Sequence, residues 1–150
     1  MSRMTIPLYY CKSRVPLVMF RMSDGQVHVG IVDTGSEVSM FDASLIGQGM
    51  CVIDDEKMTN FVGVNGDGGT SKVTQLEGTI GLKSKNGELH DVPVSGVTYD
   101  FVNLTAVFRN RIKKDIILSA IIGSDFLKEY NAKIDLKNKT LTIDYEQAAD

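Results

Sequence analysis

The segment Gly30–Ser36 (Gly-Ile-Val-Asp-Thr-Gly-Ser) carries residue types that can activate a water molecule. An apolar run leads directly into Asp33, and Gly35 then lets the backbone approach a substrate or another chain closely. The hydroxyls of Thr34 and Ser36, together with the turn amides, can hold the carboxylate in the one orientation that a general base needs. Asp33, Thr34 and Gly35 are therefore candidate catalytic residues, and Ser36 is expected to support them by donating to the carboxylate. The alternative is a purely structural turn at the end of a strand, in which the same residue types are common.

A second segment, Ser119–Leu127, combines an apolar run, a glycine and the start of a helix. Ser124 is expected to cap the first helical turn, and Asp125 suits the positive end of the helix dipole. Taken alone, this pattern predicts a buried strand that enters a short helix.

The elements that must position these segments have a period of two, which is typical of strands. Gly and Asn residues mark the tight turns of hairpins. We predict three such turns, at Ser23–Gly25, Ser84–Gly87 and Lys137–Lys139. Besides the helix after Gly123, only Asp42–Ile46 has the pattern of a helical turn. Short strands with so little helix predict an all-β, barrel-like fold, and the lack of repeats or linkers predicts a single domain over residues 1–150.

In their order and separation the two segments resemble the retropepsin-like aspartic proteases, a one-domain class of retroviral, cellular, bacterial and retroelement proteins. The resemblance spans roughly residues 15–145. It implies a closed acid-protease-type barrel with a short C-terminal helix and a flap hairpin. It places the catalytic aspartate on Asp33 and the closing glycine on Gly123, and Asp125-Phe126-Leu127 matches the non-viral branch. Ser124 stands where the retroviral enzymes have arginine, so their supporting ion pair does not carry over.

The resemblance also implies a flap, a glycine-tipped hairpin that folds over bound substrate, at Asn60–Lys72. Four of the seven residues in 63–69 are glycine, which suits a mobile tip. The glycine spacing of this segment excludes a phosphate-binding loop, and the segment lacks the pattern of acidic ligands of a calcium loop. An ordinary surface hairpin stays possible. The candidate substrate-binding residues of the flap are Val64, Gly66, Asp67, Gly68 and Gly69. The expected apolar walls of the substrate site are Val32, Val64 and Ile122.

One Asp-Thr-Gly per chain has a consequence for assembly. This type of hydrolysis needs one ionised and one protonated carboxylate. Two carboxylates about 4 Å apart repel by about 4 kcal/mol at an effective dielectric constant of about 20, so a pair retains one shared proton, as in the aspartic-protease dyad. We therefore expect a homodimer in which the two Asp33 side chains meet on the two-fold axis, with a peptide or protein substrate. The resemblance implies that Thr34 bonds across to the partner backbone.

Two other readings remain open. The same motifs would occur in a non-catalytic, protease-like binding or dimerisation module, which would show no cleavage. An unrelated β-barrel with a chance motif is the third possibility.

Composition narrows the classes of partner. A net charge of −3 argues against a nucleic-acid partner, and no apolar run approaches the roughly 18 residues of a membrane span. The sequence has no signal-peptide pattern, so we expect a cytoplasmic location with Cys11 and Cys51 reduced. Neither cysteine has metal-ligand spacing to His28 or His90, and no cofactor or metal is expected.

Overall fold

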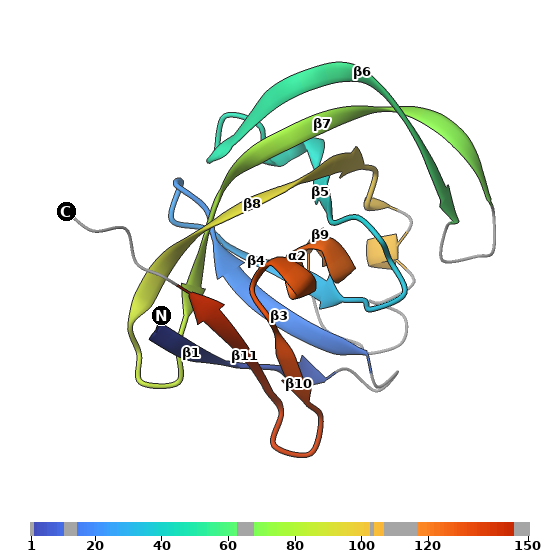
Figure 1. Cartoon of the computed structure of the whole chain (residues 1–150). Helices are drawn as coiled ribbons and strands as arrows, with labels where there is room; N and C mark the ends of the chain where they lie inside the picture. Colours follow the sequence, from blue (N-terminus) through green and yellow to red (C-terminus); the bar gives the residue numbers. More distant parts are fainter. Residues whose placement is uncertain (1, 11–14, 63–67, 103, 107–116, 146–150) are drawn as a thin grey trace.

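The structure is a computed structural model that describes residues 2–10, 15–62, 68–102, 104–106 and 117–145 (Figure 1). Within these ranges only the backbone is described at 2, 10, 55–62 and 68–73. Strands dominate the described chain, as predicted. They are β1 (Ser2–Pro7), β2 (Tyr9–Tyr10), β3 (Pro16–Arg21), β4 (Val27–Val32), β5 (Met40–Asp42), β6 (Met50–Val62), β7 (Gly68–Lys83), β8 (Leu89–Tyr99), β9 (Leu118–Ile122), β10 (Lys133–Asp135) and β11 (Thr140–Tyr145). The helical elements with assigned bounds are η1 (Ala43–Leu45) and α2 (Ser124–Glu129).

Six strands close into a barrel, in the order β3, β4, β9, β5, β8, β7 and back to β3. The closing contact between β3 and β7 is a single residue pair, Arg21 with Gly81. Most neighbours are antiparallel, but β4 lies parallel to β9 and β5 lies parallel to β8. The predicted all-β barrel is therefore confirmed.

The three predicted hairpins are also confirmed, as the pairs β3–β4, β7–β8 and β10–β11. Gly25 and Gly87 have φ angles of +79° and +92°, a left-handed conformation that glycine adopts without a steric penalty. In the third turn Lys139 takes this conformation instead, at +57°.

The predicted short helix after the closing glycine is present, but its expected cap is wrong. Gly123 occupies the N-cap position, and no side chain caps the helix. The extended backbone of β9 continues through Gly123, which moves the helix start to Ser124 and places that side chain inside the first turn. Asp125 does lie in the first turn, as the dipole argument required.

A three-stranded sheet of β1, β11 and β10 brings the two ends of the described chain side by side (Figure 1). The β1 strand was not among the sequence predictions. It pairs with β11 from Ser2 opposite Tyr145 to Pro7 opposite Thr140. At the other edge of β1, the Lys85 N–H donates to the Thr5 carbonyl at 2.9 Å, which joins this sheet to the β7–β8 turn.

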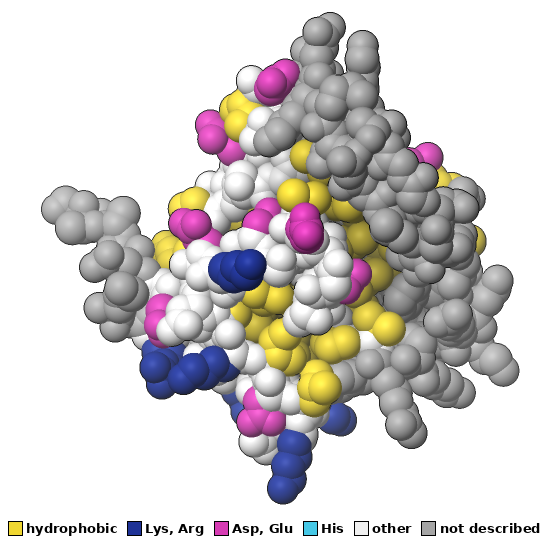
Figure 2. Space-filling model, turned by 45° about the vertical axis from the view of Figure 1, so that its right-hand side comes forward, with side chains coloured by type: hydrophobic (Ala, Val, Ile, Leu, Met, Phe, Trp, Pro, Cys, Tyr) yellow, Lys and Arg dark blue, Asp and Glu magenta, His cyan; other side chains and the backbone are white. Residues whose placement is uncertain are grey.

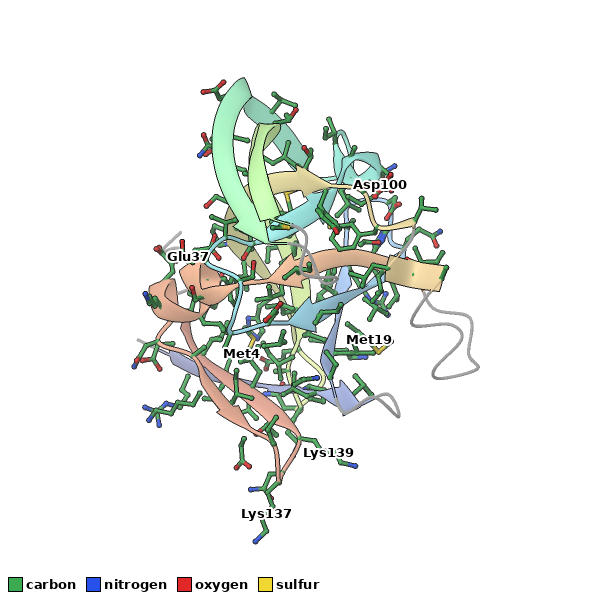
Figure 3. All side chains as sticks on the ribbon, turned by 90° about the vertical axis from the view of Figure 1, so that its right-hand side faces the viewer. Met4, Met19, Glu37, Asp100, Lys137 and Lys139 are labelled. Atoms are coloured by element: carbon green, nitrogen blue, oxygen red, sulfur yellow. The ribbon has the colours of Figure 1, made fainter. Side chains whose placement is uncertain are left out.

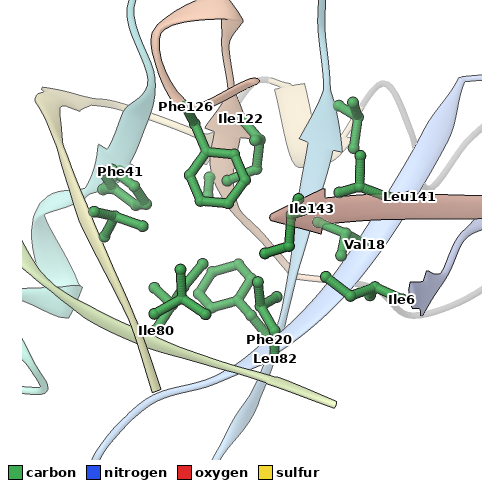
Figure 4. Close-up of a cluster of buried hydrophobic side chains, with 14 of the residues drawn as sticks. Ile6, Val18, Phe20, Phe41, Ile80, Leu82, Ile122, Phe126, Leu141 and Ile143 are labelled. Carbon is green, nitrogen blue, oxygen red and sulfur yellow. The ribbon is translucent and has the colours of Figure 1, made fainter. Parts of the chain in front are cut away.

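The main hydrophobic core fills the barrel and extends to the three-stranded sheet (Figure 4). Alternate residues of the barrel strands point inward, so β3 contributes Val18 and Phe20 while Leu17 faces the other way. The side chains labelled in Figure 4 are Ile6, Val18, Phe20, Phe41, Ile80, Leu82, Ile122, Phe126, Leu141 and Ile143.

A second core lies on the opposite face of β3, β4, β5 and β9. Leu17, Ile31, Met40 and Ile121 form it with Phe101 and other residues of the segment after β8. Both faces are covered along the whole of β9 and over the last three residues of β4, so the turn that follows β4 starts from a buried base.

Candidate active site

Asp33 follows the buried end of β4 and is held there by backbone hydrogen bonds. Its N–H donates to the Ile122 carbonyl of β9 at 2.9 Å, which extends the parallel pairing of the two strands by one residue. The Gly35 N–H donates to Asp33 Oδ1 at 2.9 Å, and the Ser36 N–H donates to the Asp33 carbonyl at 3.2 Å. The carboxylate is therefore fixed by its own turn while the residue remains partly exposed.

Gly35 and Thr34 complete this turn on its exposed side. A Cβ atom at Gly35 would lie 3.2 Å from Asp33 Oδ1, tighter than an ordinary contact, so a side chain there would press on the carboxylate. The absence of a side chain at this position leaves the carboxylate oxygen in place beside its amide donor.

Ser36 does not act as expected. Its hydroxyl donates to the Val38 carbonyl at 2.7 Å, and because a hydroxyl has only one hydrogen to donate, the expected bond to the Asp33 carboxylate is not formed. The local reason is that the chain bends at residues 37 and 38, which brings the Val38 carbonyl within hydrogen-bond distance of the hydroxyl. The Ser36 backbone carbonyl still supports the site, because it accepts a hydrogen bond from the Ser124 N–H at 2.7 Å.

Gly123 lies against the loop that follows Asp33 and is buried there. A Cβ atom at this position would come within 2.7 Å of the carbonyl oxygens of both Ser36 and Val38. These oxygens belong to the backbone and cannot rotate away, so only glycine allows the two segments to pack together. This explains physically why the apolar run of β9 ends in a glycine.

Ser39 and Asp125 form a hydrogen-bonded link that the sequence reasoning missed. The Ser39 N–H donates to Asp125 Oδ2 at 2.9 Å, and its hydroxyl donates to Asp125 Oδ1 at 2.6 Å. The same hydroxyl accepts from the Gly123 N–H at 2.9 Å. Ser39 is only 1% exposed, whereas Asp125 is partly exposed, so the bond from the Gly123 N–H is the fully buried one.

One sequence signal could have revealed this link. Ser39 is a polar residue next to the apolar Met40 and Phe41, and buried polar groups are almost always hydrogen-bonded. The partner would have remained unknown, because Asp125 is 86 residues away in the chain. The link joins the loop after Asp33 to the start of α2.

The expected apolar walls are wrong for both residues that the structure describes. Val32 and Ile122 are 5% and 2% exposed and belong to the main core. Side chains alternate between the two faces of a strand, and Val32 and Ile122 occupy positions of β4 and β9 that face the barrel interior. They therefore point into the core rather than toward a substrate. Val64 lies outside the described residues.

The predicted flap segment belongs to a long antiparallel hairpin of β6 and β7. Gly68 and Gly69 begin β7 and pair with Val62 and Phe61 of β6, whereas Val64, Gly66 and Asp67 lie outside the described residues. The described part of the hairpin arches away from the barrel, toward the side of the molecule that carries the loop with Glu37 (Figures 1 and 3).

The described residues contain no group of three or more His, Cys, Asp or Glu side chains that could hold a metal ion. His28 stacks on Phe20, with ring centroids 5.5 Å apart, and its Nδ1 lies 3.0 Å from the Ser119 hydroxyl. Cys51 is a free, exposed thiol on β6, and Cys11 lies outside the described residues. No helix in the described part of the chain is long and apolar enough to cross a membrane.

No protein-family model matches the chain, and no curated protein matches it by sequence. The solved structures that are similar to it include the following two. A retropepsin-like aspartic protease from Rickettsia conorii is 14% identical with a TM-score of 0.47, over 95% of this chain and 89% of that one. The retroviral protease-like domain of Ddi1 from Leishmania major is 19% identical with a TM-score of 0.48, over 87% of this chain and 88% of that one. This chain resembles the retropepsin-like aspartic proteases in three of its features: the closed barrel, the Asp33-Thr34-Gly35 turn, and Gly123 at the end of β9.

Proposed function

We propose that this protein is a homodimeric aspartic endopeptidase that hydrolyses peptide bonds through a water molecule activated by paired Asp33 carboxylates. The observation that carries the proposal is the position of Asp33, which is partly exposed directly after the buried end of β4, with Oδ1 fixed by the Gly35 N–H at 2.9 Å. A general base needs this combination of access and fixed orientation.

The second carboxylate comes from a second copy of the chain, because the sequence contains only one Asp-Thr-Gly. In the proposed dimer the two turns face each other across the two-fold axis, and the exposed Thr34 side chains lie where each can bond to the partner's turn. Repulsion between the carboxylates keeps one proton on the pair, so one Asp33 is a base while the other is an acid.

The reaction then follows from these two protonation states. The ionised Asp33 removes a proton from water as the water oxygen attacks the peptide carbonyl carbon, and the protonated Asp33 donates a hydrogen bond to the carbonyl oxygen. Collapse of the tetrahedral intermediate breaks the carbon–nitrogen bond, and the departing nitrogen takes a proton from the pair. Atoms and charge balance without a metal or cofactor.

The hairpin of β6 and β7 would act as the flap in this proposal. Its tip, with Val64, Gly66, Asp67, Gly68 and Gly69, would fold over a bound peptide and exclude water from the scissile bond. The glycines give the tip the backbone freedom that such a closure needs.

The direct test is cleavage of a diverse peptide library at about pH 4 to 7, read by mass spectrometry. The parent should cleave, and Asp33→Asn should lose activity by at least about a thousandfold because it removes both the base and the acid. Asp91→Asn is the matched control, since it makes the same chemical change on an exposed residue of β8 and should leave the rate unchanged.

A mixing experiment tests the shared site. If the active unit takes one Asp33 from each chain, equal amounts of parent and Asp33→Asn chains, allowed to exchange, should retain about a quarter of the parent rate. Retention of half would mean that each chain works alone. A stable dimer that cleaves nothing would instead support the binding or dimerisation module.

A further inference from the structure

A cavity of about 580 Å³ lies at the seam of the barrel, where β3 and β7 meet. The strand ladder between β3 and β7 consists of this one pair, Arg21 with Gly81, at the end of β3. The end of β1, the start of β4 and the β7–β8 turn border the remaining space. Cavities of roughly 300 to 1,000 Å³ are the usual size for small-molecule sites.

The cavity has a hydrophobic lining. Its lining includes Ile6 and Phe20, two residues of the main core that are each 1% exposed. Around them Tyr9, Met19 and Val27 are 48%, 42% and 45% exposed, and Met19 points away from the barrel (Figure 3). Single exposed hydrophobic residues are ordinary, but three large ones around one cavity are typical of a binding site.

The charged residues of the lining are all basic. Arg21, Lys83 and Lys85 line the cavity and are exposed, and none of the described Asp and Glu residues lines it, although the whole chain carries a net charge of −3. No carboxylate in the described part of the chain lies within ion-pair distance of these three cations. The cavity therefore presents a local positive potential beside an apolar surface.

We propose that this cavity binds a free fatty carboxylate. Its acyl chain would lie against Met19, Val27 and Tyr9, and its carboxylate would be held by the lysines and Arg21. A peptide is disfavoured because strand addition needs a long uncovered edge. Here β3 is covered by β2 up to Leu17 and by β7 at Arg21.

This site is separate from the proposed active site. Val27 begins β4 and Asp33 follows its other end, so about 20 Å of extended strand lies between them. The inference thus does not depend on catalysis by Asp33.

The test is calorimetric titration with dodecanoate and, as an uncharged counterpart, 1-dodecanol, both below their aggregation concentrations. Dodecanoate should bind one to one, and dodecanol at least about tenfold more weakly because it lacks the charge. The variant Lys83→Glu/Lys85→Glu should weaken dodecanoate binding by about tenfold or more. Backbone NMR should show shifted amide signals at Gly81 and Gly87, and an unchanged signal at Gly35.

The control Lys128→Glu/Lys137→Glu makes the same charge change on exposed residues of α2 and the β10–β11 turn, outside the cavity. It should bind dodecanoate like the parent. The proposal is overturned if dodecanoate does not bind at millimolar concentration, if the control loses affinity equally, or if the shifted signals lie at Gly35 instead. Tighter binding of an acidic, hydrophobic peptide to the same cavity would overturn the assignment to a fatty carboxylate.

Discussion

Replacing Ser39 by alanine should destabilise the protein well beyond an ordinary serine substitution. The change removes the donor to Asp125 Oδ1 at 2.6 Å and leaves the buried Gly123 N–H without its acceptor at 2.9 Å. A buried donor left unpaired costs about 1–3 kcal/mol and a bond to a charged group contributes about 1.5–3 kcal/mol, so we expect a loss of about 3 kcal/mol. For a domain of this length that corresponds to a fall in Tm of roughly 6–12 °C.

Thermal and guanidinium unfolding, followed by circular dichroism, measure this loss. Ser95→Ala is the matched control, because Ser95 is an exposed serine on β8 and its replacement should change stability by no more than about 0.5 kcal/mol. A double-mutant cycle of Ser39→Ala with Asp125→Asn should give a coupling energy above about 1 kcal/mol. A Tm within about 2 °C of the control, or strictly additive effects in the cycle, would refute the reasoning.

Other predictions concern the packing at the candidate site and the response to pH. Gly123→Ala should lower the free energy of unfolding by about 3 kcal/mol or prevent folding, because the added Cβ would lie 2.7 Å from two carbonyl oxygens. Equal Tm values for the variant and the parent would contradict this. The pKa of Asp135 is lowered from 3.8 by hydrogen bonds from Asn138, and that of Asp144 by a hydrogen bond from Asn131. The contribution of these two carboxylates to stability is thus present above about pH 4 and lost as pH falls through the lowered pKa values. Asn138→Ala removes the side-chain donor to Asp135 but keeps the backbone donor, so it should partly flatten the acid end of a Tm-against-pH curve. Burial raises the pKa of Tyr130 above 10.0. The neutral side chain should therefore stabilise the fold below about pH 10, and this stabilisation should disappear as pH rises through the raised pKa. Tyr130→Phe should remove this dependence of Tm on alkaline pH.

Sequence reasoning succeeded where structure is determined by neighbouring residues. The turns at Gly25 and Gly87 need backbone conformations that glycine adopts freely, so they could be located from the sequence. The orientation of the Asp33 carboxylate is similarly local, because its amide donor, Gly35, is only two residues away.

It failed where the outcome depends on which distant segments meet. The link from Ser39 to Asp125 and the packing of Gly123 on the loop after Asp33 both join segments more than 80 residues apart. The β1 strand was missed because its partner, β11, lies at the other end of the chain. The sequence reasoning assigned the Asp33 carboxylate as acceptor of the Ser36 hydroxyl, but the acceptor is the Val38 carbonyl. The bend that brings this carbonyl near the hydroxyl could not be foreseen from the sequence.

The parallel pairing of β4 with β9 has a consequence for biosynthesis. Asp33 donates its backbone N–H to the Ile122 carbonyl, so this bond cannot form until residue 122 has left the ribosome. Contacts of such long sequence separation also form slowly. A nascent chain would therefore carry Asp33 without its β9 partner until that strand has been synthesised, and any hydrolytic capacity would arise only after that point.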